Sequence, residues 1–263
     1  MPVNKTFTDQ IGEQITVSFP PCRIISIVPS LTELLFDLGL DERVVGITKF
    51  CVHPEDKFRT KPKVGGTKKI NLEKIRSLQP DLIIANKEEN EEQQVKELMN
   101  HFPVWISDIK TLDDAYEMIE KVGALVDKAE DAKHLVTSIK AMFHESATSA
   151  ALPSCAYLIW RNPYMAAGND TFINSILEAA GFKNVIRDQP RYPEITIEKL
   201  KSLNPEYVLL SSEPYPFSIK HKDELQNGMP GVKILLVDGE MFSWYGSRML
   251  KAGAYFRQLR NRL

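Results

Sequence analysis

Cysteine and long apolar runs are scarce in this sequence. Its three cysteines, Cys22, Cys51 and Cys155, lie far apart with no CxxC spacing, so neither a disulfide framework nor a zinc cluster is indicated. No stretch approaches the roughly 18 apolar residues of a membrane span, and segment 1–21 lacks the apolar core of a secretory signal. We therefore expect reduced thiols. The expected location is the cytoplasm if Met1 is the native start, and the periplasm or cell surface if a leader has been removed.

An excess of charge of one sign is also missing, because 33 Lys and Arg residues face 35 Asp and Glu residues. The formal net charge of −2 gives no electrostatic reason to expect nucleic acid or an anionic membrane as partner. No GxSxG motif, HExxH helix or spaced carboxylate pair is present, and Gly65 and Gly66 lack the spacing of a phosphate loop. We expect no catalytic residue, no metal ligand set, and a protein that is not an enzyme.

What the sequence does contain is a duplicated segment. Residues 70–84 (INLEKIRSLQPDLII) recur 125 positions later as residues 195–209 (ITIEKLKSLNPEYVL), with six of fifteen aligned residues identical. A single pair of similar segments is too few for a solenoid. In a chain of 263 residues, this offset favours two related lobes, each with a core of its own.

The first strand and helix illustrate the unit from which each lobe is expected to be built. Residues 23–28 form a short apolar run that is typical of a buried parallel strand. In the helix that follows, Ser30 is expected to act as the cap, Glu33 to return the capping-box hydrogen bond, and Gly39 to end the helix. The repeat predicts another such unit, with Asn71 as N-cap.

Strands and helices alternate along both halves, which predicts an α/β fold with a parallel sheet in each lobe. Residues 128–146 run without Gly or Pro and predict one long helix that links the lobes. The expected domains are 1–126, the linking helix 127–149, and 150–263. Residues 213–230 are expected to be irregular. Further predicted strands are 44–47, 82–85, 104–106, 155–160 and 233–237, and further predicted helices are 91–101, 112–126, 171–180 and 248–259.

Several aromatic residues fall in loops that should follow the carboxyl ends of strands, where open parallel sheets bind their ligands. Aromatic side chains in loops expose apolar area unless something covers them. These rings favour a ligand face, although each could instead act as a lid on the core of its own lobe. They are Phe50, Trp160, Tyr164, Tyr192, Phe242 and Trp244.

Two residue pairs allow both a functional and a structural interpretation. Cys51 and His53 have the donor types of a metal site, but no second pair completes it, and a packed thiol beside a backbone-bonded histidine is the simpler interpretation. Glu73 and Glu198 share the first turn of the repeated helices, where an acid stabilises the helix dipole by roughly 0.3 to 1 kcal/mol. Their equivalence also suits docking onto a two-fold symmetric partner that carries basic residues.

A combination of segments carries a resemblance to a known superfamily: residues 23–36 (RIISIVPSLTELLF), 71–75 (NLEKI), 79–83 (QPDLI), 176–181 (ILEAAG) and the long helix at 128–146. The chain resembles the substrate-binding proteins of ABC importers for cobalamin and iron-siderophores, the class III periplasmic binding proteins, and most of all their cobalamin-binding branch. The resemblance spans nearly the whole chain and is specific to the superfamily but not to its ligand.

The resemblance implies two Rossmann-like lobes with parallel sheets, joined by one stiff interlobe helix, and a ligand held in the cleft. It implies a monomer with no intrinsic cofactor, whose ligand is a cobalt corrinoid or a ferric chelate. Glu73 and Glu198 stand where the family has two docking acids that meet arginines of the permease dimer. The partner implied by this match is an ABC importer permease.

Within the cobalamin-binding branch, the resemblance also suggests pocket residues. Phe50 stands at a pocket tyrosine, Tyr192 at a pocket tryptophan, Tyr164 at a pocket phenylalanine, and Glu240 at an aspartate near the corrin amides.

The sequence departs from that branch at several pocket positions. Thr67 and Met241 stand where the cobalamin proteins have tryptophans. Lys68, Arg161 and Arg191 add positive charge to the expected cleft, and such cations can pair with carboxylate or phosphate groups of an anionic ligand.

We therefore expect a protein that binds cobalamin or a related corrinoid and delivers it to an ABC importer. An iron-siderophore or haem-binding protein is the first alternative, and it predicts that Lys68, Arg161 and Arg191 point into the cleft. A cytosolic tetrapyrrole or metal enzyme or sensor that uses Cys51, His53 and Glu240 is the second. The expected ligand-binding residues are Phe50, Cys51, His53, Thr67, Lys68, Trp160, Arg161, Tyr164, Arg191, Tyr192, Glu240, Phe242 and Trp244.

Overall fold

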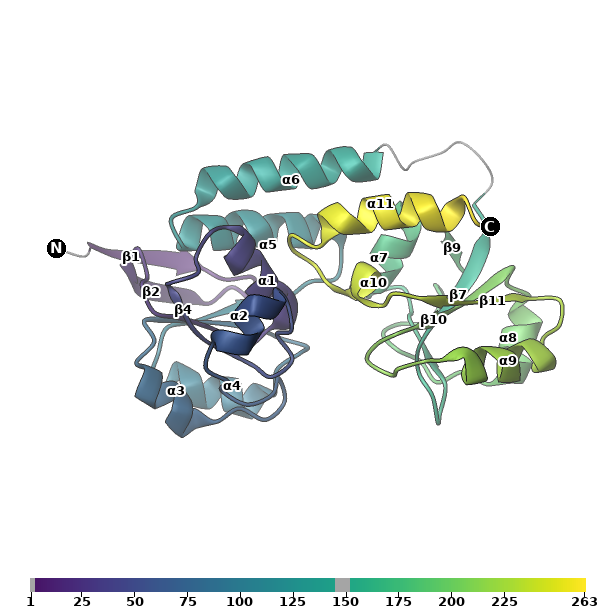
Figure 1. Ribbon diagram of the computed structural model, residues 1–263, viewed down its shortest axis with the longest axis horizontal. Helices are drawn as coiled ribbons and strands as arrows, with labels where there is room; N and C mark the ends of the chain where they lie inside the picture. The colour runs from purple at the N-terminus through teal and green to yellow at the C-terminus, as the bar shows by residue number, and fades with distance from the viewer. Residues whose placement is uncertain (1–2, 145–151) are drawn as a thin grey trace. The chain divides into compact units, whose positions relative to one another are not determined.

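The chain folds into two compact units, which Figure 1 shows as a ribbon. The computed structural model describes residues 3–144 and 152–263. Unit 1 comprises Met1–Ile109, Asp113–Ser138 and Tyr245–Arg248, and unit 2 comprises Lys110–Leu112, Ile139–Trp244 and Met249–Leu263.

Unit 1 is built around a four-stranded parallel sheet with the strand order β4-β3-β5-β6. The strands are β3 (Ile24–Ser26), β4 (Val44–Ile47), β5 (Leu82–Asn86) and β6 (Val104–Ser107). Every residue of β5 is buried, as expected for a strand that is covered on both faces. The prediction of a parallel sheet is confirmed for this unit.

Helices cover both faces of the sheet in unit 1, and in Figure 1 α3 and α4 lie below it while α5 lies above it. Alternate strand residues such as Ile25, Ile83 and Val104 share one apolar core with Ile75 of α3 and Val95 of α4. This follows from the two-residue side-chain period of a strand. The helices are α1 (Pro29–Asp37), α2 (Glu55–Thr60), α3 (Leu72–Leu78), α4 (Glu92–Met99) and α5 (Leu112–Leu125).

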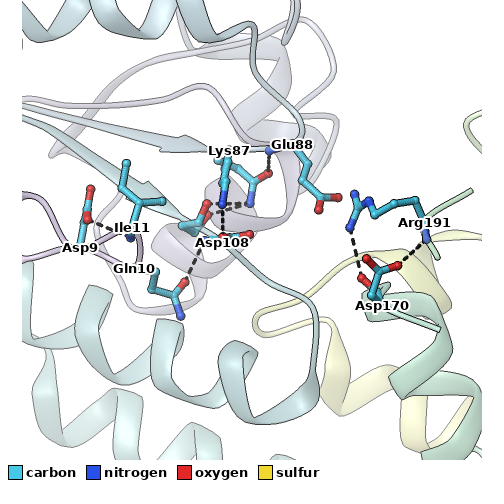
Figure 2. A network of polar contacts seen from close by, with 10 residues as sticks. Asp9, Gln10, Ile11, Lys87, Glu88, Asp108, Asp170 and Arg191 are labelled. Carbon is cyan, nitrogen blue, oxygen red and sulfur yellow. Dashed lines mark hydrogen bonds and ion pairs between the residues drawn. The ribbon is translucent and has the colours of Figure 1, made fainter. Parts of the chain in front are cut away.

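An antiparallel hairpin that the sequence analysis did not predict opens unit 1. Its strands are β1 (Val3–Thr8) and β2 (Gln14–Phe19). In its turn, Asp9 accepts hydrogen bonds from the backbone N–H groups of Ile11 and Glu13 at 3.0 and 2.8 Å. Figure 2 shows this turn beside Gln10, whose side-chain oxygen accepts from the N–H of Asp108 at 3.3 Å.

Unit 2 contains a sheet with the order β11-β10-β7-β8, in which β9 also pairs with β7. β7, β9, β10 and β11 run parallel, whereas the two-residue strand β8 is antiparallel to β7. In Figure 1, α8 and α9 lie on one side of this sheet. The elements are β7 (Ser154–Trp160), β8 (Met165–Ala166), β9 (Lys183–Asn184), β10 (Tyr207–Ser211), β11 (Lys233–Val237), α7 (Phe172–Ala179), α8 (Ile197–Leu203), α9 (Ile219–Gly228), α10 (Glu240–Ser243) and α11 (Met249–Arg260).

The long helix expected at 128–146 is present as α6 (Ala129–His144), and residues 145 and 146 lie outside the described residues. The boundary between the compact units falls inside α6, between Ser138 and Ile139. The domain limits 1–126, 127–149 and 150–263 stay a prediction, because part of the expected linker lies in the undescribed segment 145–151.

The duplicated segment forms the same local structure in both units. α3 and β5 in unit 1 correspond residue for residue to α8 and β10 in unit 2. The N-caps Asn71 and Thr196 each accept a hydrogen bond from the backbone of the third residue beyond them. The C-caps Gln79 and Asn204 both adopt a left-handed conformation with φ of 46°. The repeat therefore encodes a capped helix and the strand that follows it.

Two local predictions are wrong. Residues 213–230 are not irregular throughout, because α9 occupies Ile219–Gly228 and Ser218 forms a capping box with His221. The capping box expected at Ser30 and Glu33 does not form, since α1 begins at Pro29 with no side-chain cap. Glu33 is held instead by Arg248, a residue far away in the sequence.

Candidate functional site

The loops beyond the carboxyl ends of the strands in unit 1 are held together by two buried asparagines. Asn86, at the end of β5, donates to the carbonyl and hydroxyl oxygens of Ser107 at 3.2 and 3.0 Å. Asn90 donates to the carbonyl oxygens of Ile27 and Thr67 at 3.1 and 3.0 Å. These bonds connect loops from three different strands with the segment around Thr67. A buried amide with its donors satisfied fixes backbone positions, so this face of unit 1 is preformed.

Phe50 is the most exposed ring of the predicted set, with 49% of its surface accessible. It lies in the loop after β4, and the ammonium group of Lys49 is 5.0 Å from its ring centroid. The backbone N–H of Phe50 donates to the Thr48 hydroxyl at 3.3 Å. At Gly66, a Cβ atom would lie 3.1 Å from the Phe50 ring, so the absence of a side chain there leaves room for the ring.

Cys51 does not share the exposure of its neighbour. Its side chain is fully buried, and the thiol contacts the hydroxyl groups of Thr32 and Thr48 at 3.1 Å each. Burial raises the pKa of the Cys51 thiol above its ordinary value. The thiol therefore anchors the loop from inside the core, and contact of Cys51 with a ligand stays a prediction. His53 is half-buried. Among residues 3–144 and 152–263, no group of three His, Cys, Asp or Glu side chains is arranged to hold a metal ion.

Thr67 and Lys68 follow the tight turn at Gly65 and Gly66. Thr67 is half-buried, and its carbonyl oxygen is the one that Asn90 binds. The ammonium group of Lys68 donates to the carbonyl oxygens of Glu88 and Asn90 at 2.5 and 3.5 Å. Lys68 thus stabilises the loop after β5 with its charge.

In unit 2, Trp160 ends β7 and has 41% of its surface accessible. Its ring lies edge-on to Tyr215, with 5.7 Å between the centroids. The next residue, Arg161, donates to both carboxylate oxygens of Glu224 on α9, at 2.9 and 2.8 Å. Arg161 lowers the pKa of the Glu224 carboxyl, so the pair is ionised at neutral pH. The loop after β7 is therefore tied to α9 beside an exposed indole.

Glu213 connects the loops after β10 and β11. Its carboxylate Oε1 accepts from the Ser243 hydroxyl at 2.5 Å and from the Trp244 indole N–H at 2.9 Å. Burial raises the pKa of Glu213, and the charges of Glu240 and Asp238 act in the same direction. The Trp244 side chain is buried, with 8% of its surface accessible. Its indole serves to position these loops, whereas Glu240 is half-buried beside them.

Two further predicted rings contribute to the core of unit 2. Phe242 is fully buried, with its centroid 4.9 Å from Tyr157 and 4.8 Å from Phe256. Phe242 is therefore a core residue of unit 2, and its contact with a ligand stays a prediction. Tyr164 is half-buried and packs against the apolar core that lies between the sheet and α8.

Arg191 is hydrogen-bonded to Asp170, as Figure 2 shows, and Tyr192 is the next residue of the loop. The backbone N–H of Arg191 donates to the Asp170 carboxylate, and its guanidinium donates to the Asp170 carbonyl at 3.1 Å. Arg191 has a positive φ of 59°. Its guanidinium carbon lies 5.4 Å from the Tyr192 ring centroid. Both side chains are half-buried.

Glu73 and Glu198 are exposed in the first turns of α3 and α8. The residues around them match in detail: Ile75 and Leu200 are fully buried, and the hydroxyls of Ser77 and Ser202 each donate to a carbonyl one turn earlier at 2.8 Å. The two acids therefore occupy equivalent, exposed positions on the two repeated helices.

Three residues that organise these loops were missed from the sequence: Asn86, Asn90 and Glu213. Asn86 was detectable in principle, since it follows the fully apolar run of β5 at the strand end where ligand-binding loops begin. Glu213 gave no local signal, because its partners Ser243 and Trp244 are about 30 residues away.

The fold and the chain's sequence match one protein family. Residues 24–231 match the periplasmic binding protein family, and the chain belongs to that family. An uncharacterised ABC transporter substrate-binding lipoprotein of Bacillus subtilis, YvrC, is 26% identical over 259 residues, which cover 94% of this chain and 82% of that protein. A vitamin B12-binding protein of Pectobacterium carotovorum is 25% identical over 239 residues, covering 88% of this chain and 86% of that protein.

Solved structures share the fold. The periplasmic vitamin B12 binding protein BtuF of Vibrio cholerae has a TM-score of 0.76 and 20% identity, over 93% of this chain and 99% of that one. A periplasmic haem-binding protein of Roseiflexus, RhuT, has a TM-score of 0.77 and 22% identity, over 90% of this chain and 98% of that one. A catecholate-siderophore binding protein of Vibrio cholerae, VctP, has a TM-score of 0.78 and 15% identity, over 98% of this chain and 100% of that one. The class of fold is thus that of class III periplasmic binding proteins.

None of the helices within residues 3–144 and 152–263 is long and apolar enough to cross a membrane.

Proposed function

We propose that this protein is the substrate-binding component of an ABC importer and that its ligand is cobalamin or a related corrinoid. Membership of the periplasmic binding protein family supports the first part. The vitamin B12-binding relative, which is similar along most of both chains, supports the second. The lipoprotein relative from Bacillus subtilis supports a location outside the cytoplasm.

The observation that carries this proposal is the exposure of Phe50 and Trp160. Each ring stands at the carboxyl end of a strand, one in unit 1 and one in unit 2, and each keeps more than a third of its surface accessible. A planar apolar ring held on a preformed loop suits contact with the flat face of a macrocycle. Little ordering is then needed on binding, which favours affinity.

The acids near these loops support a corrinoid over a polyanionic chelate, and the three cations expected to face the ligand make contacts within their own units. Arg161 is paired with Glu224, and Lys68 and the guanidinium of Arg191 donate to backbone carbonyls of their own units. The loops after β10 and β11 add carboxylates, with Glu213, Asp238 and Glu240 close enough to influence one another. Carboxylates accept hydrogen bonds from amide N–H groups, which a corrinoid carries on its rim, and they repel the carboxylates of haem.

Calorimetric titration with cyanocobalamin tests the proposal. We expect saturable binding, weakened about tenfold or more in Phe50→Ala and in Trp160→Ala, because each change removes a large exposed contact area. Phe7→Ala is the matched control, since Phe7 stacks on Phe19 in the N-terminal hairpin. The absence of binding at high micromolar concentration would overturn the corrinoid assignment. Binding of ferric haem or a ferric catecholate instead would favour the iron-chelate alternative.

The proposal extends to docking on the permease. Glu73 and Glu198 have matching exposed positions on α3 and α8, and a permease dimer with two-fold symmetry offers two equivalent basic sites. The burial of Cys51 among hydroxyl groups gives no support to an enzyme or sensor that uses this thiol as a metal ligand or nucleophile.

A further inference from the structure

The chain crosses from unit 2 into unit 1 at the peptide bond between Trp244 and Tyr245, and it leaves unit 1 again after Arg248. Trp244 follows α10 with φ of −89° and ψ of 107°, which is an extended conformation. Consecutive side chains of an extended chain point to opposite sides. The side chains of Trp244 and Tyr245 can therefore bind residues of different units, although the two residues are neighbours in the sequence.

Trp244 holds an acid at the end of a strand in unit 2. Its indole Nε1 donates to Glu213 Oε1 at 2.9 Å, and Glu213 lies two residues beyond the end of β10. Glu213 is also closely packed against Gly239, because a Cβ atom at Gly239 would lie 2.7 Å from Glu213 Cγ and 2.4 Å from the Ser211 hydroxyl. A charge-assisted bond in such close packing restricts the loop after β10.

Tyr245 holds an acid at the end of a strand in unit 1. Its hydroxyl donates to Glu89 Oε1 at 2.7 Å, and Glu89 lies three residues beyond the end of β5. Burial, and then the charge of Glu89, raise the pKa of Tyr245, so the phenol stays protonated and remains a donor. The backbone N–H of Glu89 also donates to Asn86 at 2.9 Å, which links Tyr245 to the asparagine network of this face.

The two strands concerned, β5 and β10, are the equivalent strands of the duplication. From this we infer that Trp244 and Tyr245 are positioning residues: they hold the corresponding loops of both units and couple the conformations of these loops through one peptide bond. The inference rests on the proposed function, because that is what makes the two loops ligand-facing. The far end of the crossing segment is fixed by the buried pair of Arg248 with Glu33, so a displacement is passed along the segment.

Hydrogen exchange of the ligand-free protein tests this coupling. We expect Tyr245→Phe to accelerate amide exchange in residues 86–90 about tenfold or more, because a hydrogen bond to a charged acceptor is lost. We also expect a several-fold acceleration in residues 212–217, where the variant removes no bond. Trp244→Phe lacks the indole N–H. It should accelerate exchange about tenfold or more in residues 212–217 and several-fold in residues 86–90. Acceleration confined to the loop that lost its bond would overturn the coupling, and no acceleration in either loop would overturn the positioning role.

Conservative variants separate positioning from a general loss of stability. Glu89→Gln keeps an acceptor oxygen for Tyr245 and should retain slow exchange in residues 86–90, whereas Glu89→Ala should behave like Tyr245→Phe. Tyr207→Phe is the matched control, since the Tyr207 hydroxyl bonds to the Leu263 carbonyl at the opposite end of β10. In this variant, amide exchange in residues 86–90 and 212–217 should be unchanged. Equal acceleration in Tyr207→Phe would show a merely global effect and would overturn the inference.

Calorimetry with cyanocobalamin adds a functional measurement. Tyr245→Phe and Trp244→Phe should each weaken binding about fivefold or more, and the double variant should lose less than the product of the two effects, because both act on one coupled element. Independent, multiplicative losses would contradict the coupling. If the unmodified protein does not bind cyanocobalamin, the ligand assignment fails, while the exchange experiment still decides the role of the two aromatics.

Discussion

Arg248 lies against Glu33, with its Nε 2.7 Å from Oε2 and its Nη2 2.8 Å from Oε1. The two side chains are only 6% and 4% exposed, and they are 215 positions apart in the sequence. A buried, bidentate pair of this kind costs free energy to desolvate but costs more when one partner is lost. The pair therefore makes the segment Tyr245–Arg248 a structural part of unit 1.

We predict that Arg248→Met lowers the free energy of unfolding by about 3 to 5 kcal/mol, because the buried carboxylate of Glu33 loses the cation that binds both of its oxygens. The double variant Arg248→Met with Glu33→Leu should recover a large part of that loss. Urea unfolding measures both values. Arg59→Met is the surface control, since the pair of Arg59 with Glu55 is exposed and contributes at most about 1 kcal/mol. A loss in Arg248→Met no larger than in this control would contradict the prediction.

The raised pKa of Glu213 predicts that the stability of the protein depends on pH. Its pKa is raised by burial, so between the ordinary carboxyl pKa and the folded pKa the native state binds more protons than the unfolded state. Stability from this group therefore falls as pH rises through that window. Gln keeps an acceptor for Trp244 but carries no charge, so Glu213→Gln should become more stable relative to the parent protein as pH rises from 4 to 7. Urea unfolding at several pH values checks this, and a constant difference across the range would contradict it.

The cysteines should differ sharply in reactivity. Cys22 is exposed, whereas Cys51 and Cys155 are fully buried. Burial raises the pKa of both inner thiols. We predict that one thiol per native molecule reacts rapidly with a disulfide reagent, and that Cys22→Ser removes this reaction. The other two should react only as the protein unfolds, in urea. Rapid reaction of Cys51 in the native protein would show that its loop opens, contrary to the thiol–hydroxyl contacts described above.

Docking on the permease predicts a separation of binding from transport. Glu73→Ala and Glu198→Ala should each reduce ligand uptake, and together abolish it, while calorimetric affinity stays within about twofold, because both side chains lie on exposed helix turns. Glu92→Ala is the matched control, since Glu92 is an exposed acid in the first turn of α4. An uptake defect equal in the control, or a parallel loss of affinity, would count against docking through these two acids.

Local sequence patterns predicted most of the regular structure. The strands at 44–47 and 233–237 have the predicted limits, and Asn71 caps α3 as predicted. These features depend on residues within one or two turns of each other, so that periodicity and capping chemistry suffice to predict them. The hairpin β1–β2 escaped prediction because its strands are mostly exposed and carry a weak apolar pattern.

The surroundings of each candidate residue required the tertiary structure. Phe50 and Cys51 are adjacent in one loop, yet the ring is half exposed and the thiol is fully buried. Trp160 and Phe242 are both strand-end aromatics, but only Trp160 remains accessible, since Phe256 and Tyr157 cover Phe242. These differences arise from neighbours that are distant in the sequence, which periodicity does not report.

The sequence by itself determined that the chain is a duplicated α/β protein, because hydrophobic period, caps and the repeat are encoded in short segments. It also determined the equivalent exposure of Glu73 and Glu198, which follows from identical helical positions. Only the tertiary structure decided that Glu33 pairs with Arg248 and that Trp244 and Tyr245 hold the acids Glu213 and Glu89. Each of these contacts joins residues at least about 30 positions apart, and folding alone brings such residues together.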